Sequence, residues 1–201
     1  MKLVIDHLTR YGYDEEVKFS TQYLRLTPRS TARQTITAWT LTLPDGAAVT
    51  TTDGWGNVLH VLTLDNPHKE ITIRASGIVD IADEGEETRD EEAELLSPLV
   101  FLRCTPLTRA DRAIREFAQR LYRPGAAEES LNQLMADLLL RMPYSPGATQ
   151  VQDSAADAFA RAKGVCQDHT HVFLACCRAL EIPARYVSGY VYSDNAQHVA
   201  M

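Results

Sequence analysis

The sequence predicts an α+β protein, with an N-terminal antiparallel β-sandwich in residues 1–94 and a helical region in residues 95–201. Hydrophobic residues alternate with the period of a β-strand up to about residue 80, and after residue 108 they recur with the period of a helix. Between the two patterns, residues 83–94 form an acidic stretch without apolar periodicity. Such a stretch is typical of a solvated linker, so it marks the predicted domain boundary.

The N-terminal region reads as several short strands separated by turn residues. The alternation runs up to the turn at residues 44–46 and resumes after the glycine-rich turn at residues 53–57. Repeated short strands with this spacing are typical of a sandwich of two sheets. The predicted strand positions are Val17, Phe19, Tyr23, Leu24 and Leu26, then Thr35, Thr37, Trp39, Leu41 and Leu43, then Val58, His60, Leu62 and Leu64, and finally Ile71, Ile73 and Ala75.

Four helices are predicted in the C-terminal region. Thr108 and Asp111 provide an N-cap signal for the first helix, and the second ends near Pro143. Ser154 is the predicted cap of a short third helix, after which Gly164 is expected to adopt the left-handed conformation of a C′ residue. The apolar stripes of these helices are predicted to form a core, and they comprise Ile114, Phe117, Ala118 and Leu121, then Leu131, Leu134, Met135, Leu138 and Leu139, then Ala155, Ala158, Phe159 and Ala162.

The fourth helix, from Cys166 to about Leu180, is apolar on nearly every side, which predicts a central position in the core. It ends before Pro183, and residues 184–192 are rich in aromatic and β-branched residues, so they are predicted to form a strand. Only residues 193–201 follow, which leaves this strand without a sheet to join. We therefore expect the chain to be the N-terminal part of a longer protein, and the strand to offer an open edge through which copies of the chain self-associate.

The composition argues against several classes of partner and cofactor. A formal net charge of −7 argues against nucleic acid or an anionic membrane as a partner, because both select basic surfaces. No stretch approaches the ~20 apolar residues of a membrane span and no secretion signal is evident, so a cytoplasmic protein is expected. No cofactor or metal is expected, because the histidines lack the spacing of a ligand set. The four cysteines are Cys104, Cys166, Cys176 and Cys177. They are too few and too irregularly spaced for a disulfide framework and form no CxxC pair, so reduced thiols are expected.

The candidate catalytic residue is Cys166, at the start of the fourth predicted helix. The N–H groups of a first helical turn have no intrahelical acceptor and the helix dipole is positive there, so a thiolate is favoured over a thiol. The same N–H groups can hold the oxyanion that forms when a thiolate attacks a carbonyl. An unreactive buried cysteine is the alternative that these residues alone leave open.

Several segments together resemble a bacterial transglutaminase-like protein. They are Asp53-Gly54-Trp55-Gly56-Asn57-Val58, Tyr144-Ser145-Pro146-Gly147-Ala148-Thr149, the short helix with Ala155 and Ala158, Gly164-Val165-Cys166-Gln167-Asp168, and Ala179-Leu180-Glu181-Ile182-Pro183-Ala184-Arg185-Tyr186-Val187-Ser188-Gly189-Tyr190. The resemblance implies a papain-type core, as in cysteine proteases, transglutaminases and peptide N-glycanases, preceded by a β-rich region. It makes Cys166 the nucleophile of acyl transfer through a thioester, with Gln167 and Tyr144 lining the cleft.

The resemblance also implies a histidine in a His-Ala-Trp motif, followed by an Asp or Asn on the next strand. This chain departs from that pattern, because His198 is followed by Val199-Ala200-Met201. His198 is therefore one candidate base, and a histidine beyond Met201 is the other. His169 and His171 lie on the same helix as Cys166, whereas a base must approach the sulfur from across a cleft, so structural roles are expected for both.

Two functions from different classes follow. The first is a cysteine-dependent amide hydrolase or acyltransferase, peptidase-like, that acts on a peptide or protein substrate. This chain alone is expected to be inactive, since a nucleophile without its base loses most of the rate. The alternative is a non-catalytic module that binds a peptide or protein through the β domain or the cleft.

Overall fold

The computed structural model describes residues 1–82 and 96–190. The chain divides into two compact units, Met1–Leu96 and Ser97–Met201. All six strands precede the four α-helices in the described residues, which confirms the predicted α+β class. The acidic segment 83–94, predicted to be a linker, lies outside the described residues.

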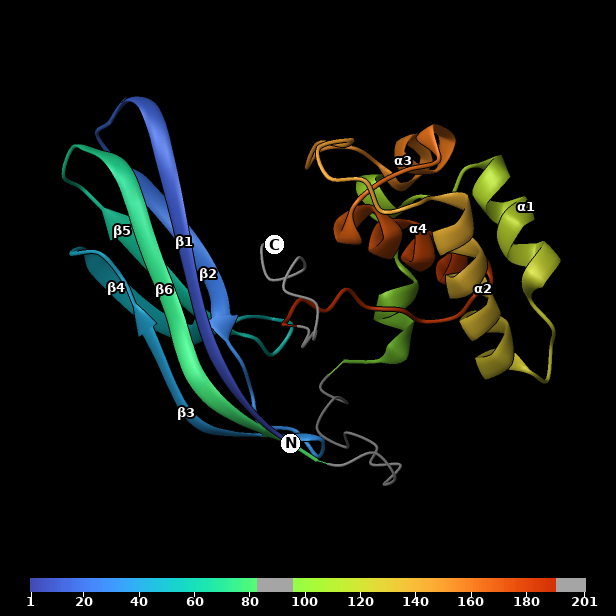
Figure 1. Cartoon of the computed structure of the whole chain (residues 1–201), viewed down its shortest axis with the longest axis horizontal. Helices are drawn as coiled ribbons and strands as arrows, with labels where there is room; N and C mark the ends of the chain where they lie inside the picture. Colours follow the sequence, from blue (N-terminus) through green and yellow to red (C-terminus); the bar gives the residue numbers. More distant parts are fainter. Residues whose placement is uncertain (83–95, 191–201) are drawn as a thin grey trace. The chain divides into compact units, whose positions relative to one another are not determined.

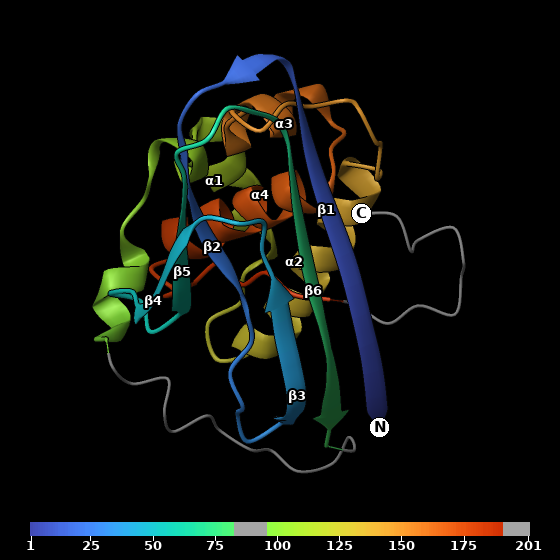
Figure 2. The same cartoon turned by 90° about the vertical axis from the view of Figure 1, so that its left-hand side faces the viewer.

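The first unit contains two three-stranded antiparallel sheets, in the orders β1-β6-β3 and β2-β5-β4 (Figures 1 and 2). Their strands are β1 (Lys2–Val17), β2 (Ser20–Thr27), β3 (Gln34–Thr42), β4 (Ala47–Thr52), β5 (Val58–Leu64) and β6 (His68–Ile81). Strands β5 and β6 follow each other in sequence but belong to different sheets, so the chain crosses between the two layers after residue 64. This arrangement confirms the predicted sandwich.

The sandwich core lies between the two sheets. Leu62 of β5 and Ile71 of β6 are completely buried, and both belong to one apolar cluster although they come from different sheets. The other buried members of this cluster are Leu24, Leu64 and Ile73. The period-two alternation in the sequence therefore identified the inward-facing side of these strands, because successive side chains of a strand point to opposite faces.

The second unit is helical. It contains two short 3-10 helices, η2 (Pro98–Leu102) and η3 (Pro106–Thr108), followed by α1 (Arg112–Leu121), α2 (Ala127–Arg141), α3 (Ala155–Arg161) and α4 (Cys166–Ala179). Helix α4 contacts each of the other three α-helices, which agrees with its predicted central position. Within residues 1–82 and 96–190, no helix is both long enough and apolar enough to span a membrane.

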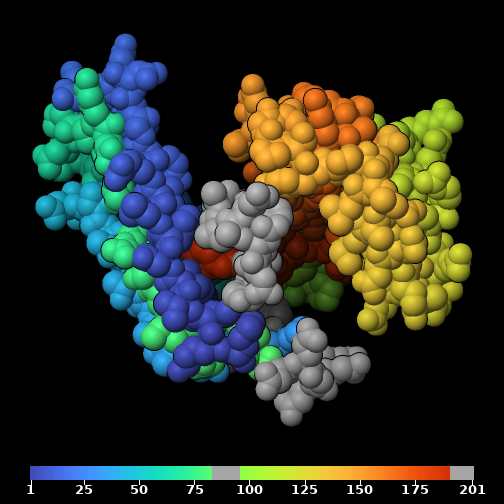
Figure 3. Space-filling view, viewed as in Figure 1, coloured from blue at the N-terminus to red at the C-terminus, as the bar shows by residue number. Residues whose placement is uncertain are grey.

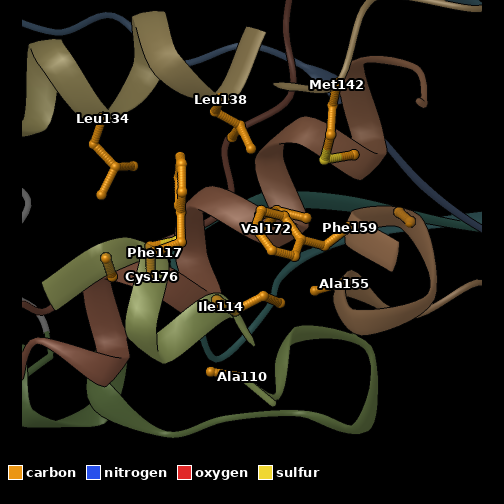
Figure 4. Close-up of a cluster of buried hydrophobic side chains, with 13 residues drawn as sticks. Ala110, Ile114, Phe117, Leu134, Leu138, Met142, Ala155, Phe159, Val172 and Cys176 are labelled. Carbon is orange, nitrogen blue, oxygen red and sulfur yellow. The ribbon is translucent and has the colours of Figure 1, made fainter. Parts of the chain in front are cut away.

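Side chains from all four α-helices meet in the core of the second unit (Figure 4). Ile114 of α1, Leu134 of α2 and Val172 of α4 are at most 1% exposed, and Phe159 of α3 packs beside them. The rings of Phe117 and Phe159 lie with their centroids 5.3 Å apart. Residues from each of the predicted apolar stripes thus meet in one shared core.

The predicted N-cap signal of α1 was partly wrong. Asp111, not Thr108, caps α1, since its carboxylate accepts a hydrogen bond from the Ile114 N–H at 2.8 Å. Thr108 instead ends η3 and accepts a hydrogen bond from Arg178 at 2.6 Å. Thr108 and Asp111 are each good cap residues, and the sequence alone did not show which of them faces the first turn.

The apolar stripe predicted on α2 is only partly buried. Leu134 and Leu138 belong to the core, whereas Met135 is 45% exposed and Leu139 is 58% exposed. In the space-filling view, α2 and the segment after it, gold to orange, lie on the surface of the helical unit (Figure 3). The helix therefore buries a narrower stripe than the sequence contains.

The predicted strand at residues 184–192 is not observed in its described part, which ends at residue 190. The backbone of residues 182–190 pairs with no strand in the part of the chain that the structure describes. The segment is held by η2 instead: the Ala184 N–H donates to the Phe101 carbonyl at 3.4 Å, and the Arg185 guanidinium lies 4.5 Å from the centre of the Phe101 ring. A high β propensity does not by itself supply a partner strand. Self-association through this segment stays a prediction.

Candidate active site around Cys166

Cys166 is the first residue of α4 and is exposed, as the sequence predicted for its position. Val165, the N-cap residue, has an extended backbone with φ −108° and ψ −177°. The chain therefore enters the helix directly at the thiol. The positive end of the helix dipole and the first-turn N–H groups lie at this residue.

The four cysteines occupy three environments. Cys104 is exposed between η2 and η3, and Cys176 and Cys177 are buried within α4. Burial raises the pKa of Cys176 to about 12 and that of Cys177 to about 11, because a thiolate loses its hydration there. These two thiols are core residues, and Cys166 is the exposed cysteine at a helix N-terminus.

Asp168 fixes the backbone immediately before Cys166. Its side chain is 1% exposed, and its Oδ2 accepts hydrogen bonds from the Val165 N–H at 2.8 Å and from the Thr149 hydroxyl at 2.6 Å. Asp168 also lies in the first turn of α4, where the helix dipole favours a carboxylate. The hydrogen bond from Thr149 also joins the first turn of α4 to a loop residue that lies 19 positions earlier in the sequence. No local signal in the sequence points to Thr149.

Gly164 makes room for this carboxylate. A Cβ atom at residue 164 would lie 2.6 Å from the Cβ of Asp168, closer than non-bonded carbon atoms approach. The expected left-handed conformation at Gly164 was wrong: Ala162 ends α3 with φ 54° and ψ 36°. The glycine is needed for space and not for backbone conformation.

The loop after α2 lies against the same turn and includes both predicted cleft residues. Tyr144 forms an isolated parallel bridge with Gly164, and the next N–H, that of Ser145, donates to the Gly164 carbonyl at 2.8 Å. The side-chain amide of Gln167 donates to the Val151 carbonyl at 3.1 Å. The structure thus brings Tyr144 and Gln167 to the Cys166 segment, where Tyr144 is 44% exposed.

His169 joins this loop to the helix and is occupied by backbone contacts. Its Nδ1 lies 2.8 Å from the Val165 carbonyl oxygen, and its Nε2 lies 2.5 Å from the Met142 carbonyl oxygen. Carbonyl oxygens only accept, so a ring nitrogen that carries a proton can donate to the carbonyl that faces it. The ring therefore connects the end of α2 to the residue before Cys166, which agrees with the structural role expected for His169.

His171 is buried two residues further along α4. It is 8% exposed, and its Nδ1 has no hydrogen-bond partner among the described residues. Burial lowers the pKa of His171, Asp168 opposes this by favouring the charged ring, and Arg178 lowers the pKa further. Its ring centroid lies 5.9 Å from that of Tyr186. A neutral core histidine fits these surroundings better than a base for Cys166.

Neither the candidate His198 nor the histidines of the first unit add to the described site. His198 lies outside the described residues. His60 and His68 bond to strand hydroxyls in the first unit, with Thr27 and Ser20 as partners. Among the residues that the structure describes, no three His, Cys, Asp or Glu side chains come close enough to hold a metal ion.

Comparison with protein families identifies both units. Residues 3–80 match the family described as the bacterial transglutaminase-like N-terminal region, and residues 115–200 match the transglutaminase-like superfamily. The second match contains the whole of the Cys166 site described above. The segments that resembled this family in the sequence fall within the two matched ranges.

Two similar proteins extend over nearly the whole chain. An uncharacterized protein of Mycobacterium leprae is 31% identical over 199 residues, which cover 95% of this chain and 71% of the relative. An uncharacterized protein of Mycobacterium tuberculosis is 30% identical over 209 residues, which cover 94% of this chain and 66% of the relative. This chain therefore spans only part of the length of the relatives that it matches.

A solved structure shares the fold. It is that of a proposed cysteine protease from Cytophaga hutchinsonii, with a TM-score of 0.72 and 21% sequence identity, and the match covers 91% of this chain and 65% of that chain. At this identity the likeness concerns the fold alone. It agrees with the predicted β-rich region followed by the first part of a papain-type core.

Proposed function

Because this chain belongs to the transglutaminase-like superfamily, we propose that Cys166 is the nucleophile of a cysteine-dependent amide hydrolase or acyltransferase. The observation that carries the proposal is an exposed thiol on the first residue of a central helix. The backbone before it is held by Asp168 and by the loop after α2, so the main chain that carries the thiol is fixed in place. Such fixation lowers the entropic cost of reaching the transition state.

The proposed reaction passes through a thioester. Sγ of Cys166 bonds to the amide carbonyl carbon while a base takes the thiol proton, and the first-turn N–H groups of α4 stabilise the oxyanion. The C–N bond then breaks, and the protonated base gives its proton to the leaving amine. Water or a second amine attacks the thioester and loses a proton to the base. The C–S bond breaks and the thiol is restored.

The base of this reaction is a separate part of the proposal. His169 is occupied by two backbone carbonyls and His171 is buried, so neither is assigned to it. His198 is the candidate within this sequence, and the part of the relatives' length that this chain does not span is the other source. Either source would have to bring a histidine to the exposed side of Cys166.

We propose a peptide or protein as the substrate, held in part by Tyr144 and Gln167. Both lie next to the Cys166 segment, and the exposed phenol of Tyr144 can contact a substrate chain. The solved structure with the same fold is described as that of a proposed cysteine protease, and a protease cleaves peptide amides. This description supports a peptide amide as the bond that is attacked. Hydrolysis and transfer to an amine differ only in the group that attacks the thioester.

The proposal is tested by alkylation of this chain with iodoacetamide, followed by peptide mass spectrometry. At about pH 6 we expect Cys166 to react at least tenfold faster than Cys104, which is also exposed but does not begin a helix. Cys176 and Cys177 serve as internal controls for folding, because they react only when the core opens. Equal rates at Cys166 and Cys104 would count against a nucleophile.

An activity assay with the whole protein tests whether it is an enzyme of the proposed class. With the complete chain, amide cleavage or amine incorporation on a protein substrate should be lost in Cys166→Ala and retained in Cys104→Ala. Activity that persists in Cys166→Ala would exclude the proposed mechanism. A whole protein with an inert Cys166 and no activity would favour a module that only binds its partner.

A further inference from the structure

A surface groove is lined by residues of α1, α2 and α3, none of which is assigned to the Cys166 site. Its volume is about 360 Å³, and it is lined by Ala113, Glu116, Phe117, Arg120, Arg141 and Phe159. A second hollow of about 470 Å³ shares Phe117, Arg120 and Arg141 with it and adds Asp137 and Leu140. The two hollows therefore form one continuous depression around a pair of arginines.

The floor of this groove is aromatic. The rings of Phe117 and Phe159 are tilted at 58° to each other, with centroids 5.3 Å apart. The guanidinium carbon of Arg141 lies 4.0 Å from the centre of the Phe159 ring, and that of Arg120 lies 5.7 Å from the centre of the Phe117 ring. Contact with an aromatic face restrains a guanidinium without using its N–H donors.

The two arginines have no acidic partner. Within residues 1–82 and 96–190, neither guanidinium forms a hydrogen bond or an ion pair, in a chain with more acidic than basic residues. The nearby carboxylates are engaged elsewhere: Glu116 accepts from Arg112 at 2.6 Å, and Asp137 accepts from the Gln133 amide at 2.7 Å. The groove thus offers two restrained positive groups above an apolar floor.

The helix dipole explains only part of this arrangement. Arg120 and Arg141 stand in the last turns of α1 and α2, where a positive charge is favourable. The dipole does not require that both side chains meet over two adjoining aromatic rings. Guanidinium forks match carboxylates in geometry, so two arginines held at the surface of one groove can pair with carboxylates of a ligand.

We propose that this groove binds an acidic peptide segment of a partner protein, with carboxylates paired to Arg120 and Arg141. The open shape over three helices suits an extended peptide. The net charge of −7 disfavours a nucleic acid as the source of the anionic groups. The proposal does not depend on chemistry at Cys166, because it uses none of the residues of that site.

Fluorescence anisotropy with a fluorescein-labelled hexaglutamate peptide tests this site at low ionic strength, using the whole chain as it stands. We expect Arg120→Gln and Arg141→Gln each to weaken binding by about threefold and the double variant by about tenfold. Arg123→Gln removes the same charge from an exposed residue that does not line the groove, so its affinity should match that of the wild type. A matched hexaglutamine peptide should not bind.

Two further measurements make the test decisive. Arg141→Lys keeps the charge but not the planar fork, so it should restore part of the affinity lost in Arg141→Gln. In NMR titrations the amide shifts should concentrate at Ala113, Phe117 and Leu140. The proposal is wrong if hexaglutamate does not bind the wild type, or if Arg123→Gln weakens binding as much as Arg141→Gln does.

Discussion

The carboxylate of Asp168 occupies the space that a side chain on residue 164 would need. A Cβ at Gly164 would lie 2.8 Å from Asp168 Oδ2, the same oxygen that accepts from the Val165 N–H and the Thr149 hydroxyl. Gly164 and Asp168 stand on either side of Cys166 in the sequence. The position of the proposed nucleophile therefore depends on a fit between two residues that do not take part in the chemistry.

Replacement of Gly164 by alanine tests this fit. Gly164→Ala should lower the free energy of unfolding by about 1–3 kcal/mol, because a well-packed site must shift to admit the added methyl group. It should also slow alkylation of Cys166, since the displaced Asp168 no longer holds the Val165 N–H. Urea unfolding and iodoacetamide mapping measure the two effects.

A matched control is Gly189→Ala. No atom lies within 4 Å of a Cβ built at Gly189, and its backbone does not have positive φ, so little loss of stability is expected there. If the two variants unfold at the same urea concentration, the close fit between residues 164 and 168 does not contribute to the free energy of unfolding.

Protonation of His171 should destabilise the protein at mildly acidic pH. Burial is the largest cause that lowers its pKa below the usual 6.5, so the unfolded chain binds a proton that the folded chain excludes. The free energy of unfolding should therefore fall as the pH drops below about 6.5, and the loss should end near the lowered pKa of the folded state. Most carboxylates titrate below this window.

His171→Phe keeps a ring beside Tyr186 and removes the titrating group. In urea titrations between about pH 7 and pH 5, this variant should show a flatter dependence of stability on pH than the wild type does. An unchanged slope in His171→Phe would mean that other groups cause the acid sensitivity.

The buried cysteines should make the protein sensitive to alkaline pH. Burial raises the pKa values of Cys176 and Cys177 to about 12 and about 11 from a usual value of 9.0, so the folded state keeps protons that the unfolded state loses. Stability should fall as the pH rises above 9, by about 1.4 kcal/mol for each thiol at about pH 10. Urea unfolding at about pH 8 and pH 10 measures this loss.

Cys176→Ala and Cys177→Ala should each reduce the alkaline loss, although both lower the stability at neutral pH by leaving a small cavity. Cys104→Ala, an exposed position, should leave the slope unchanged. A slope that survives in the double variant Cys176→Ala/Cys177→Ala would assign the alkaline loss to other groups.

Most of the secondary structure could be predicted from local patterns, because helix caps and strand or helix periodicity involve residues that are close in the sequence. Ser154 caps α3 as predicted, and its hydroxyl and Asp157 bond reciprocally across the first turn. The start of α4 at Cys166 also followed from local signals. The predictions failed where the outcome depends on distant partners: Leu139 is exposed although it continues an apolar stripe, and residues 184–190 find no strand to pair with in the described chain.

The sequence by itself determined the α+β class, the inward faces of β5 and β6, and the placement of Cys166 at the N-terminus of an apolar helix. Periodicity and capping are local, so they can be read along the chain. Only the tertiary structure decided what surrounds the thiol: Asp168 pairs with Thr149, and His169 bonds to the Met142 carbonyl across 27 residues. These contacts form when the loop after α2 packs against α4, and no spacing in the sequence encodes which residues then meet.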